Sequence, residues 1–285
     1  MAEIKLEHVS YLYGKDTPFE KKALDDINLT FKVGAITGII GHTGSGKSTL
    51  AQLLNGILKP TSGRVLLDGK DLFSDSKSKS ATRFRIGLVF QYPEYQLFEE
   101  TVYQDIAFGP KNMGKNEQEI RKLVEEAAHF TGVDKNLMNR SPFELSGGQK
   151  RRVAIAGVLA MDPEVIVLDE PAAGLDPSGR EEILGRLCTY QKEKGKTVIL
   201  ISHSMEDVAR FADELLVLKE GRAFLHDTVD RVFANAKLLQ EASLSLPQIS
   251  KLVLLLREKG LDISPSLHTV SDLHFELKRL LKGGE

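Results

Sequence analysis

The sequence predicts an α/β fold with a mostly parallel sheet core, an inserted helical subdomain and a small C-terminal helical domain. Short apolar runs, such as residues 35–40 and 197–201, suit strands buried on both faces. Glycine or polar residues follow these runs directly, as expected where parallel strands end at one edge of a sheet. We therefore expect an α/β domain at 1–232, a helical subdomain within it at about 92–162, and a helical dimerisation or packing domain at 233–285.

A glycine-rich loop separates the first of these strands from a predicted helix at 48–58. The loop reads Gly41-His42-Thr43-Gly44-Ser45-Gly46-Lys47-Ser48, which matches the pattern G-x-x-x-x-G-K-S. In this pattern the glycines let backbone N–H groups approach phosphates, the lysine reaches the β- and γ-phosphates, and the serine hydroxyl binds Mg²⁺. The fold is thus predicted to be a P-loop nucleotide-binding domain. Its candidate nucleotide contacts are Gly41, Gly44, Ser45, Gly46, Lys47, Ser48 and Thr49.

A second candidate phosphate site follows about a hundred positions later and lacks a lysine. It reads Leu145-Ser146-Gly147-Gly148-Gln149. Ser146 is a natural N-cap, the two glycines allow close backbone approach, and the helix beginning near Gln149 directs its positive end outward. The chain either uses both sites on one nucleotide or offers the second to a nucleotide held by another chain. The second alternative implies a head-to-tail pair.

The remaining elements are predicted from periodicity. Residues 4–90 read mainly as strands, with a turn at 59–63 and a polar loop at 75–80, and a helix is predicted at 116–131. Strands and helices alternate again after residue 164. Two amphipathic helices end the chain, with apolar positions Leu246, Ile249, Val253 and Leu256 in the first and Val270, Leu273, Leu277 and Leu280 in the second. Their apolar faces either cover the nucleotide domain or form a seam with another subunit, and we expect the seam.

Residues 145–149 resemble the Leu-Ser-Gly-Gly-Gln signature of the ATP-binding-cassette family. In that family two subunits enclose two ATP molecules, each between the phosphate loop of one subunit and the signature of the other. The resemblance implies that Ser146, Gly147, Gly148 and Gln149 bind ATP held by another chain. It also implies that Asp176, in Gly174-Leu175-Asp176, lies in the loop that crosses to the opposite subunit and contributes to the ATP site.

The candidate catalytic residues follow apolar strands. Residues 165–168 lead into Asp169 and Glu170, as expected where a central parallel strand delivers acids at its carboxyl end. Asp169 is placed to hold Mg²⁺. Glu170 resembles the family's catalytic carboxylate, which polarises the attacking water; the alternatives are a second acid near the metal or a surface charge. His203, after residues 197–201, resembles the histidine that contacts the γ-phosphate and orients that acid.

Two further positions are assigned by resemblance. Gln91 resembles the glutamine that contacts both Mg²⁺ and the attacking water and links the site to the membrane partner. An aromatic residue is expected to stack on adenine, and Tyr13 fits that position better than Tyr11 or Phe19. The alternative for Tyr13 is that it lines one face of an edge strand.

A narrower resemblance, to the ATPases of energy-coupling factor transporters, rests on residues 17–24, 91–98 and the helical tail. Members of that group power the import of vitamins or metal ions in prokaryotes. It implies pairing with a paralogous ATPase subunit, although a homodimer stays open, and contact with a transmembrane coupling subunit and, through it, a substrate-binding membrane subunit. The aromatic segment 91–98 is a candidate groove for a helix of the coupling subunit, or else packs inside the helical subdomain. The alternatives are a soluble ATPase of the same superfamily and a nucleotide-binding module without turnover.

Composition is consistent with these expectations. The 285 residues carry a net charge of −2, and the pI near 6.4 gives no basic footprint, so we expect no nucleic-acid partner. No stretch approaches the roughly 18 apolar residues that span a bilayer, and no apolar signal region begins the sequence. We therefore expect a peripheral protein at the cytoplasmic face of the cell membrane.

Overall fold

The computed structural model describes residues 2–74 and 84–282, so the polar loop predicted at 75–80 lies outside the described residues. The strands are β1 Ile4–Tyr13, β2 Lys21–Thr30, β3 Ile36–Ile40, β4 Ser62–Leu67, β5 Lys70–Asp71, β6 Ile86–Val89, β7 Val165–Asp169, β8 Thr197–Ile201, β9 Glu214–Lys219 and β10 Arg222–Thr228. The α-helices are α1 Lys47–Leu54, α3 Val102–Asn112, α4 Glu117–Thr131, α5 Gly147–Leu159, α6 Pro177–Lys194, α7 Met205–Phe211, α8 Val229–Ala234, α9 Ala236–Glu241, α10 Gln248–Glu258 and α11 Val270–Lys282. Short 3₁₀ helices are η1 Pro93–Gln96, η2 Lys135–Leu137 and η3 Pro142–Glu144.

The core contains a largely parallel sheet with the order β10-β9-β3-β8-β7-β6 among the described residues. The pairs from β9 to β6 are parallel, and only β10 pairs antiparallel in this sheet. Every position of β3, β7 and β8 is buried, as is typical of parallel strands covered on both faces. In β7, Val165 and Val167 pack into the cluster containing α1, whereas Ile166 and Leu168 pack into the cluster containing α5 and α6. The predicted α/β fold with its mostly parallel core is therefore confirmed.

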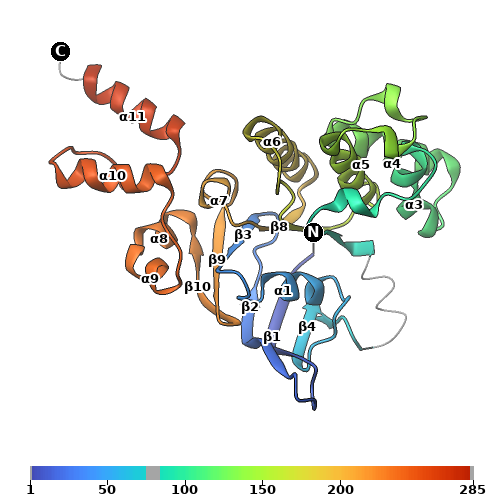
Figure 1. Cartoon of the computed structure of the whole chain (residues 1–285), viewed down its shortest axis with the longest axis horizontal. Helices are drawn as coiled ribbons and strands as arrows, with labels where there is room; N and C mark the ends of the chain where they lie inside the picture. The colour runs from blue at the N-terminus through green and yellow to red at the C-terminus, as the bar shows by residue number, and fades with distance from the viewer. Residues whose placement is uncertain (1, 75–83, 283–285) are drawn as a thin grey trace.

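A second, antiparallel sheet with the order β2-β1-β4-β5 lies beside α1 (Figure 1). Its strands β1 and β2 pair with Tyr13 opposite Lys21. Buried Ile4 and Leu6 alternate with exposed Lys5 on β1, so one face of this sheet packs on the core. The α1 helix lies between the two sheets and contacts β2, β6 and β7. The loop before α1 consequently reaches both sheets.

Four strands deliver their carboxyl ends to one edge of the parallel sheet. In the order β3-β8-β7-β6, the residues just beyond these ends are the phosphate loop, His203, Glu170 and Gln91. The helix after the phosphate loop is shorter than predicted, because it ends at Leu54 and not at 58. Gly56 adopts a left-handed conformation with φ of 77°, which terminates the helix and leaves Ile57 exposed.

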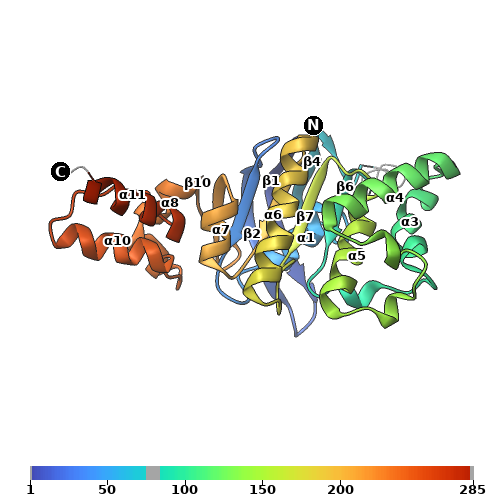
Figure 2. The ribbon, with the colours of Figure 1, turned by 90° about the horizontal axis from the view of Figure 1, so that it is seen from above.

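Helices α3, α4 and α5 form one end of the molecule, and α10 and α11 form the other (Figure 2). Asn116 caps α4 and Ser146 caps α5, each in a reciprocal capping box with the residue three positions later. The helix predicted at 116–131 and the N-cap role of Ser146 are thus confirmed. None of the helices in the described ranges combines the length and the apolar character that a membrane span requires.

The predicted C-terminal amphipathic helices are α10 and α11, which pack together as a hairpin. Their small core contains Val253, Ile263 and Leu273. Val270, predicted on the apolar face, is 71% exposed.

A buried histidine ties the hairpin to α8. His268 Nδ1 lies 2.8 Å from Ser250 Oγ on α10, and its Nε2 lies 3.0 Å from Asp230 Oδ1 on α8. The ring also packs edge-on against Phe233, with centroids 5.1 Å apart. The hairpin is therefore attached through a polar and aromatic contact that is separate from its own apolar core.

Candidate active site

The phosphate loop is shaped by glycines that no other residue replaces without strain. Gly46, the N-cap of α1, has a φ of 104°, and a Cβ there would lie 2.6 Å from the carbonyl oxygen of Ala23. A Cβ at Gly41 would lie 2.4 Å from the carbonyl oxygen of Leu218. Because Gly46 has no side chain to cap α1, the first N–H groups of the helix face the cleft without a capping acid. Such a helix start favours an anion.

Lys47 is held against the loop itself. Its Nζ donates to the carbonyl oxygens of Gly41 at 2.7 Å and His42 at 3.1 Å, and the residue is 6% exposed. Burial lowers the pKa of Lys47, while the charges of Glu170 and Asp169 oppose that shift. The ammonium group thus lies inside the loop.

Asp169 and Ser48 form a set of hard oxygen donors beside the lysine. Burial raises the pKa of Asp169, and a hydrogen bond with Ser48 and the charge of Lys47 pull it back. Carboxylate and hydroxyl oxygens are ligands that Mg²⁺ accepts, and this ion usually completes its shell with water and substrate phosphates. In agreement, the described residues contain no cluster of three or more His, Cys, Asp or Glu side chains that would hold a metal alone. The donor set therefore fits Mg²⁺ brought in with a nucleotide.

Glu170 and His203 lie close enough to act together. The Nε2 atom of His203 is 3.2 Å from Glu170 Oε1. Burial, followed by the charge of Asp169, raises the pKa of Glu170 to about 7. Burial and the charge of Lys47 lower the pKa of His203. A carboxylate with a pKa near neutrality is suited to accept a proton from water or to polarise it.

Most of the predicted site residues line one cleft of about 390 Å³. The predicted residues in its wall are Tyr13, Gly44, Gly46, Lys47, Ser48, Thr49, Gln91, Asp169, Glu170 and His203. Gly41 and Ser45 lie behind this wall, where they shape the loop. Sequence reasoning missed Lys21, Ala23 and Thr43. Lys21 enters because β2 pairs it with Tyr13, and the long connection between these strands gave no sequence signal for that register.

Tyr13 lines the same cleft as the acids. Its hydroxyl lies 3.1 Å from Thr49 Oγ1, and its ring packs edge-on against Tyr11 at 4.8 Å between centroids. With 40% of its surface exposed, Tyr13 leaves ring surface available for stacking. Adenine stacking on Tyr13 stays a prediction, because the same position also lies on a strand of the antiparallel sheet.

The second candidate phosphate site does not join this cleft. Ser146, Gly147, Gly148 and Gln149 form the start of α5, outside the cleft wall. A Cβ on Gly147 or Gly148 would meet no atom within 4 Å among the described residues, so this helix start faces open space. Asp176 caps α6, its Oδ1 accepting from Gly179 N at 2.7 Å, and it also lies outside the cleft. Of the two alternatives, this geometry favours a nucleotide held by another chain.

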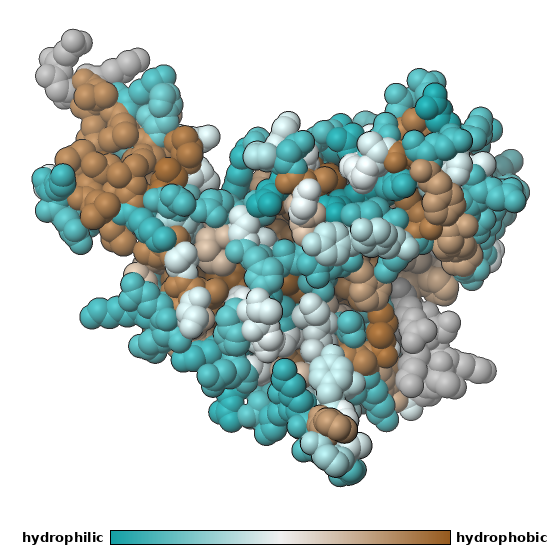
Figure 3. Space-filling view, in the orientation of Figure 1, coloured by the Kyte–Doolittle hydropathy of each residue, from teal (hydrophilic) through white to brown (hydrophobic). Residues whose placement is uncertain are grey.

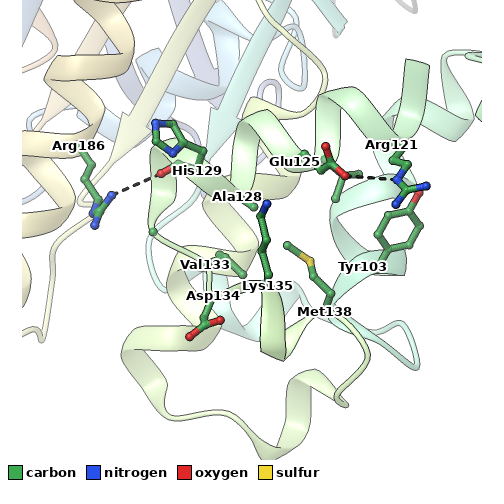
Figure 4. Close-up of a pocket in the computed structure, with 12 residues that line it drawn as sticks. Tyr103, Arg121, Glu125, Ala128, His129, Val133, Asp134, Lys135, Met138 and Arg186 are labelled. Atoms are coloured by element: carbon green, nitrogen blue, oxygen red, sulfur yellow. Dashed lines mark hydrogen bonds and ion pairs between the residues drawn. The ribbon is translucent and has the colours of Figure 1, made fainter. Parts of the chain in front are cut away.

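A larger cavity of about 620 Å³ lies in the helical region between α4 and its neighbours (Figure 4). Both of its arginines are engaged: Arg121 pairs with Glu125 at 3.3 Å, and Arg186 donates to the carbonyl oxygen of His129 at 3.4 Å. It contains no glycine loop at a helix start and no adjacent acids of the kind found beside Lys47. The larger cavity therefore lacks the features of a phosphate site, so cavity size alone would identify the wrong site.

Comparison with known proteins agrees with this geometry. The ABC transporter family model matches residues 24–173. The chain belongs to the ABC transporter family. Among curated relatives, this ABC ATPase is 51% identical over 278 residues to the energy-coupling factor transporter ATP-binding protein EcfA2 of Clostridium tetani, covering 97% of this chain and 96% of the relative. It is also 51% identical to the EcfA2 protein of Clostridium acetobutylicum over 283 residues, with 99% of both chains covered.

Solved structures show the same fold. The chain is 45% identical to cbiO1 from Clostridium perfringens, described as part of the ABC transporter complex cbiONQ, with a TM-score of 0.75 over 88% of this chain and 98% of that one. It is 31% identical to the ATP-binding cassette MJ0796, seen as a dimer in a post-hydrolysis state with ADP and phosphate, with a TM-score of 0.71 over 79% and 98% of the two chains. As an ABC ATPase, this protein binds and hydrolyses ATP.

Proposed function

We propose that this ABC ATPase powers an energy-coupling factor importer for vitamins or metal ions from the cytoplasmic face of the cell membrane. Its relatives from two Clostridium species carry the name of energy-coupling factor transporter ATP-binding proteins, and they match nearly the whole chain. The observation that carries the proposal on this chain is an exposed aromatic segment beside Gln91 with an apolar groove next to it.

In the proposed site, each predicted residue has a task in ATP hydrolysis. The glycine loop, Lys47 and Thr49 hold the phosphates, while Ser48, Asp169 and Gln91 hold Mg²⁺. When bound, the ion neutralises phosphate charge as it redistributes during phosphoryl transfer. Glu170 polarises the attacking water, and His203 orients that carboxylate.

A second ATPase subunit completes each site in this proposal. The start of α5 is exposed and lies outside the cleft of its own chain, so it suits a phosphate held by a partner. The dimeric MJ0796 structure, 31% identical to this chain, supports a pair of cassettes. We propose a paralogous ATPase as partner, with Ser146, Gly147, Gly148, Gln149 and Asp176 facing the nucleotide of the other subunit.

The C-terminal hairpin supplies a further surface for this pairing. Figure 3 shows a continuous hydrophobic area over α10 and α11. Exposed apolar residues of the hairpin are Leu252, Leu254, Leu255, Leu261, Val270, Phe275, Leu280 and Leu281. An apolar area of this kind marks an interaction site on a stable protein. We propose that residues 233–285 form a dimerisation domain whose apolar face meets the corresponding helices of the partner.

A helix of the transmembrane coupling subunit fits the groove beside Gln91. This groove, of about 520 Å³, runs along α3 and α5 and includes Leu97, Phe98, Asp105 and Phe108. Phe98 packs edge-on against Phe108 at 4.8 Å, and Tyr95 nearby is 84% exposed. Tyr92, Tyr95 and Phe98 are thus exposed, whereas Pro93 is buried and Leu97 packs against the core of the helical region. The exposed side chains support docking, and the other two fit the alternative considered from sequence.

Asp105 adds a polar anchor to the groove. Its Oδ1 accepts from the N–H groups of Phe98 at 3.2 Å and Glu99 at 3.3 Å. Its Oδ2 is buried and finds no hydrogen-bond partner within the described parts of the chain. An unsatisfied buried acceptor costs about 1–3 kcal/mol, so a donor from a docked helix stabilises the complex.

Co-purification tests the proposal. We expect the chain, expressed with its genomic neighbours and extracted in detergent, to recover a paralogous ATPase and a small multi-spanning protein, identified by mass spectrometry. Recovery of a soluble homodimer alone, with ATP turnover unaffected by membranes, would support a soluble ABC ATPase and contradict the proposal.

Phe98→Ala tests the groove itself, and Tyr95→Ala tests the exposed aromatic segment beside it. We expect both variants to recover less of the multi-spanning protein while binding ATP normally, because neither side chain lines the nucleotide cleft. Phe143→Ala is a matched control, since Phe143 is also exposed but lies away from the groove. Normal recovery of the multi-spanning protein with both Tyr95→Ala and Phe98→Ala would exclude this docking surface.

A further inference from the structure

A buried arginine joins three segments that carry different parts of the ATPase site. Arg151 on α5 donates through Nε to Glu94 Oε2 at 3.0 Å and through Nη2 to Glu94 Oε1 at 2.6 Å. Its Nη1 donates to the carbonyl oxygen of Ala173. The Arg151 side chain is 4% exposed and that of Glu94 is 15% exposed. All three guanidinium nitrogens are thus committed in a nearly dry environment.

These contacts fix positions as well as balancing charge. The guanidinium group is planar, so a two-point bond to Glu94 sets the orientation of η1 relative to α5. The third nitrogen then sets the distance from α5 to the loop that follows β7. Tyr92 closes the same junction, with its ring centroid 6.0 Å from the guanidinium carbon, and a Cβ on Gly174 would lie 3.9 Å from that ring.

Each segment leads directly to a functional group. Glu94 follows Gln91 by three residues and precedes the exposed Tyr95. Arg151 lies five residues after Ser146 on the capped helix α5, a distance of roughly 7.5 Å at 1.5 Å per residue. Ala173 donates its own N–H to the carbonyl oxygen of Glu170 at 3.1 Å. A continuous chain of contacts therefore runs from the groove segment through Arg151 to the backbone of Glu170 and to the signature helix.

We propose that Arg151 is a positioning residue that sets Glu170 and the signature helix according to the position of the segment 91–98. A displacement of η1 by a docked helix moves Glu94, and the two-point bond transmits that displacement to α5 and Ala173. Closure of the ATP-bound pair acts through the same contacts in the opposite direction. The membrane end of this relay rests on the groove proposed above, whereas the link between Arg151, the signature helix and Glu170 lies within the ATPase itself.

Three variants test the relay. Arg151→Lys keeps the charge but loses the two-point bond, Glu94→Gln keeps the shape but loses the charge, and the third variant combines both. Arg152→Lys is the matched control, because the adjacent Arg152 faces α6, where it pairs with Glu182 at 2.6 Å. Turnover is measured on the full chain with its co-purified subunits and on the ATPase chains without the membrane protein, together with ATP affinity and the melting temperature.

We expect kcat to fall roughly ten- to hundredfold in Arg151→Lys and in Glu94→Gln, because small displacements of a catalytic group have effects of that size. The affinity of a single chain for ATP stays unchanged, since neither residue lines its own cleft. The double variant is no slower than the slower single variant, because both changes break one connection. Arg152→Lys retains wild-type kcat.

Other results overturn the relay. The relay would be excluded if both single variants fold and keep the wild-type kcat. It would also be excluded if the fold reduction of kcat in the double variant equals the product of the reductions in the two single variants. A purely structural role is indicated if the melting temperature falls and kcat is restored on cooling. If Arg151→Lys does not fold, the kcat of Glu94→Gln alone decides. A wild type that recovers no membrane protein refutes the proposed partner, and turnover of the ATPase chains then still tests the link to Glu170.

Discussion

Replacing His268 with alanine should open the C-terminal hairpin without unfolding the ATPase core. The ring is 7% exposed and reaches both Ser250 on α10 and Asp230 on α8. In His268→Ala the hydroxyl of Ser250, which is 4% exposed, loses the partner it has in this structure. The core cluster of α10 and α11 is small: among the described residues, its fully buried members are Val253, Ile263 and Leu273. The contacts of His268 therefore add a substantial share to what holds the hairpin.

The size of the effect follows from these contacts. Orphaning a buried hydroxyl costs about 1–3 kcal/mol, and the edge-on contact with Phe233 contributes about 0.5–1.5 kcal/mol. The bond to Asp230 adds little, because that carboxylate is largely exposed. A total of about 1.5–4.5 kcal/mol raises the population of the opened hairpin roughly tenfold to a thousandfold.

Hydrogen exchange followed by mass spectrometry measures this opening on the full chain. We expect peptides covering α10 to exchange faster in His268→Ala, while peptides covering β7 and β8 keep wild-type rates. His274→Ala is the control, because His274 is exposed on α11. Unchanged exchange in α10, or equal acceleration by both variants, would refute the reasoning.

Three further predictions follow from buried ionisable groups. Glu170→Gln should lower phosphate release by roughly 10²–10⁴-fold while ATP still binds, because the amide cannot take a proton from water; equal turnover in a steady-state assay would contradict its catalytic role. Burial raises the pKa of Asp105, so its ionised form lowers the stability of the fold, and this cost is lost as pH falls through the raised pKa. Asp105→Asn should therefore be more stable than wild type at neutral pH, and urea titrations should show that the difference shrinks on mild acidification. A difference in stability that does not depend on pH would argue against a charge effect. Burial raises the pKa of Cys188 to about 11, so iodoacetamide should modify this thiol slowly in the folded protein at neutral pH and rapidly in denaturant. Mass spectrometry measures the modification. Fast modification of the folded protein would mean that the thiolate is accessible.

Local sequence patterns predicted most of the site, because the chemistry lies just beyond strands whose apolar runs are easy to recognise. Asp169, His203 and the phosphate loop each follow such a run, and parallel pairing brings them to one edge. The end of α1 was predicted four residues too late. The apolar spacing continued to Ile57, but the left-handed conformation of Gly56 ends the helix first.

Long-range contacts were beyond sequence reasoning. The antiparallel sheet formed by β1, β2, β4 and β5 depends on pairing partners that no periodicity specifies. The same holds for Lys21 in the cleft wall. Arg151 and Glu94 are 57 positions apart, and each alone looks like an ordinary surface charge in the sequence. Their burial arises only when α5 packs against η1.

The two sheets meet at the nucleotide cleft, and this has a mechanical consequence. Tyr13 and Lys21 belong to the antiparallel sheet, whereas Asp169 is the last residue of β7 in the parallel sheet and Glu170 follows it. A nucleotide bound in this cleft would therefore contact both sheets, which are also joined by α1 and by the contact of β2 with β10. In the proposed site, loss of the terminal phosphate would remove contacts near Glu170 and His203 and keep those with the phosphate loop. Hydrolysis would therefore change how firmly the nucleotide joins the two sheets within one subunit, as well as the affinity of the pair.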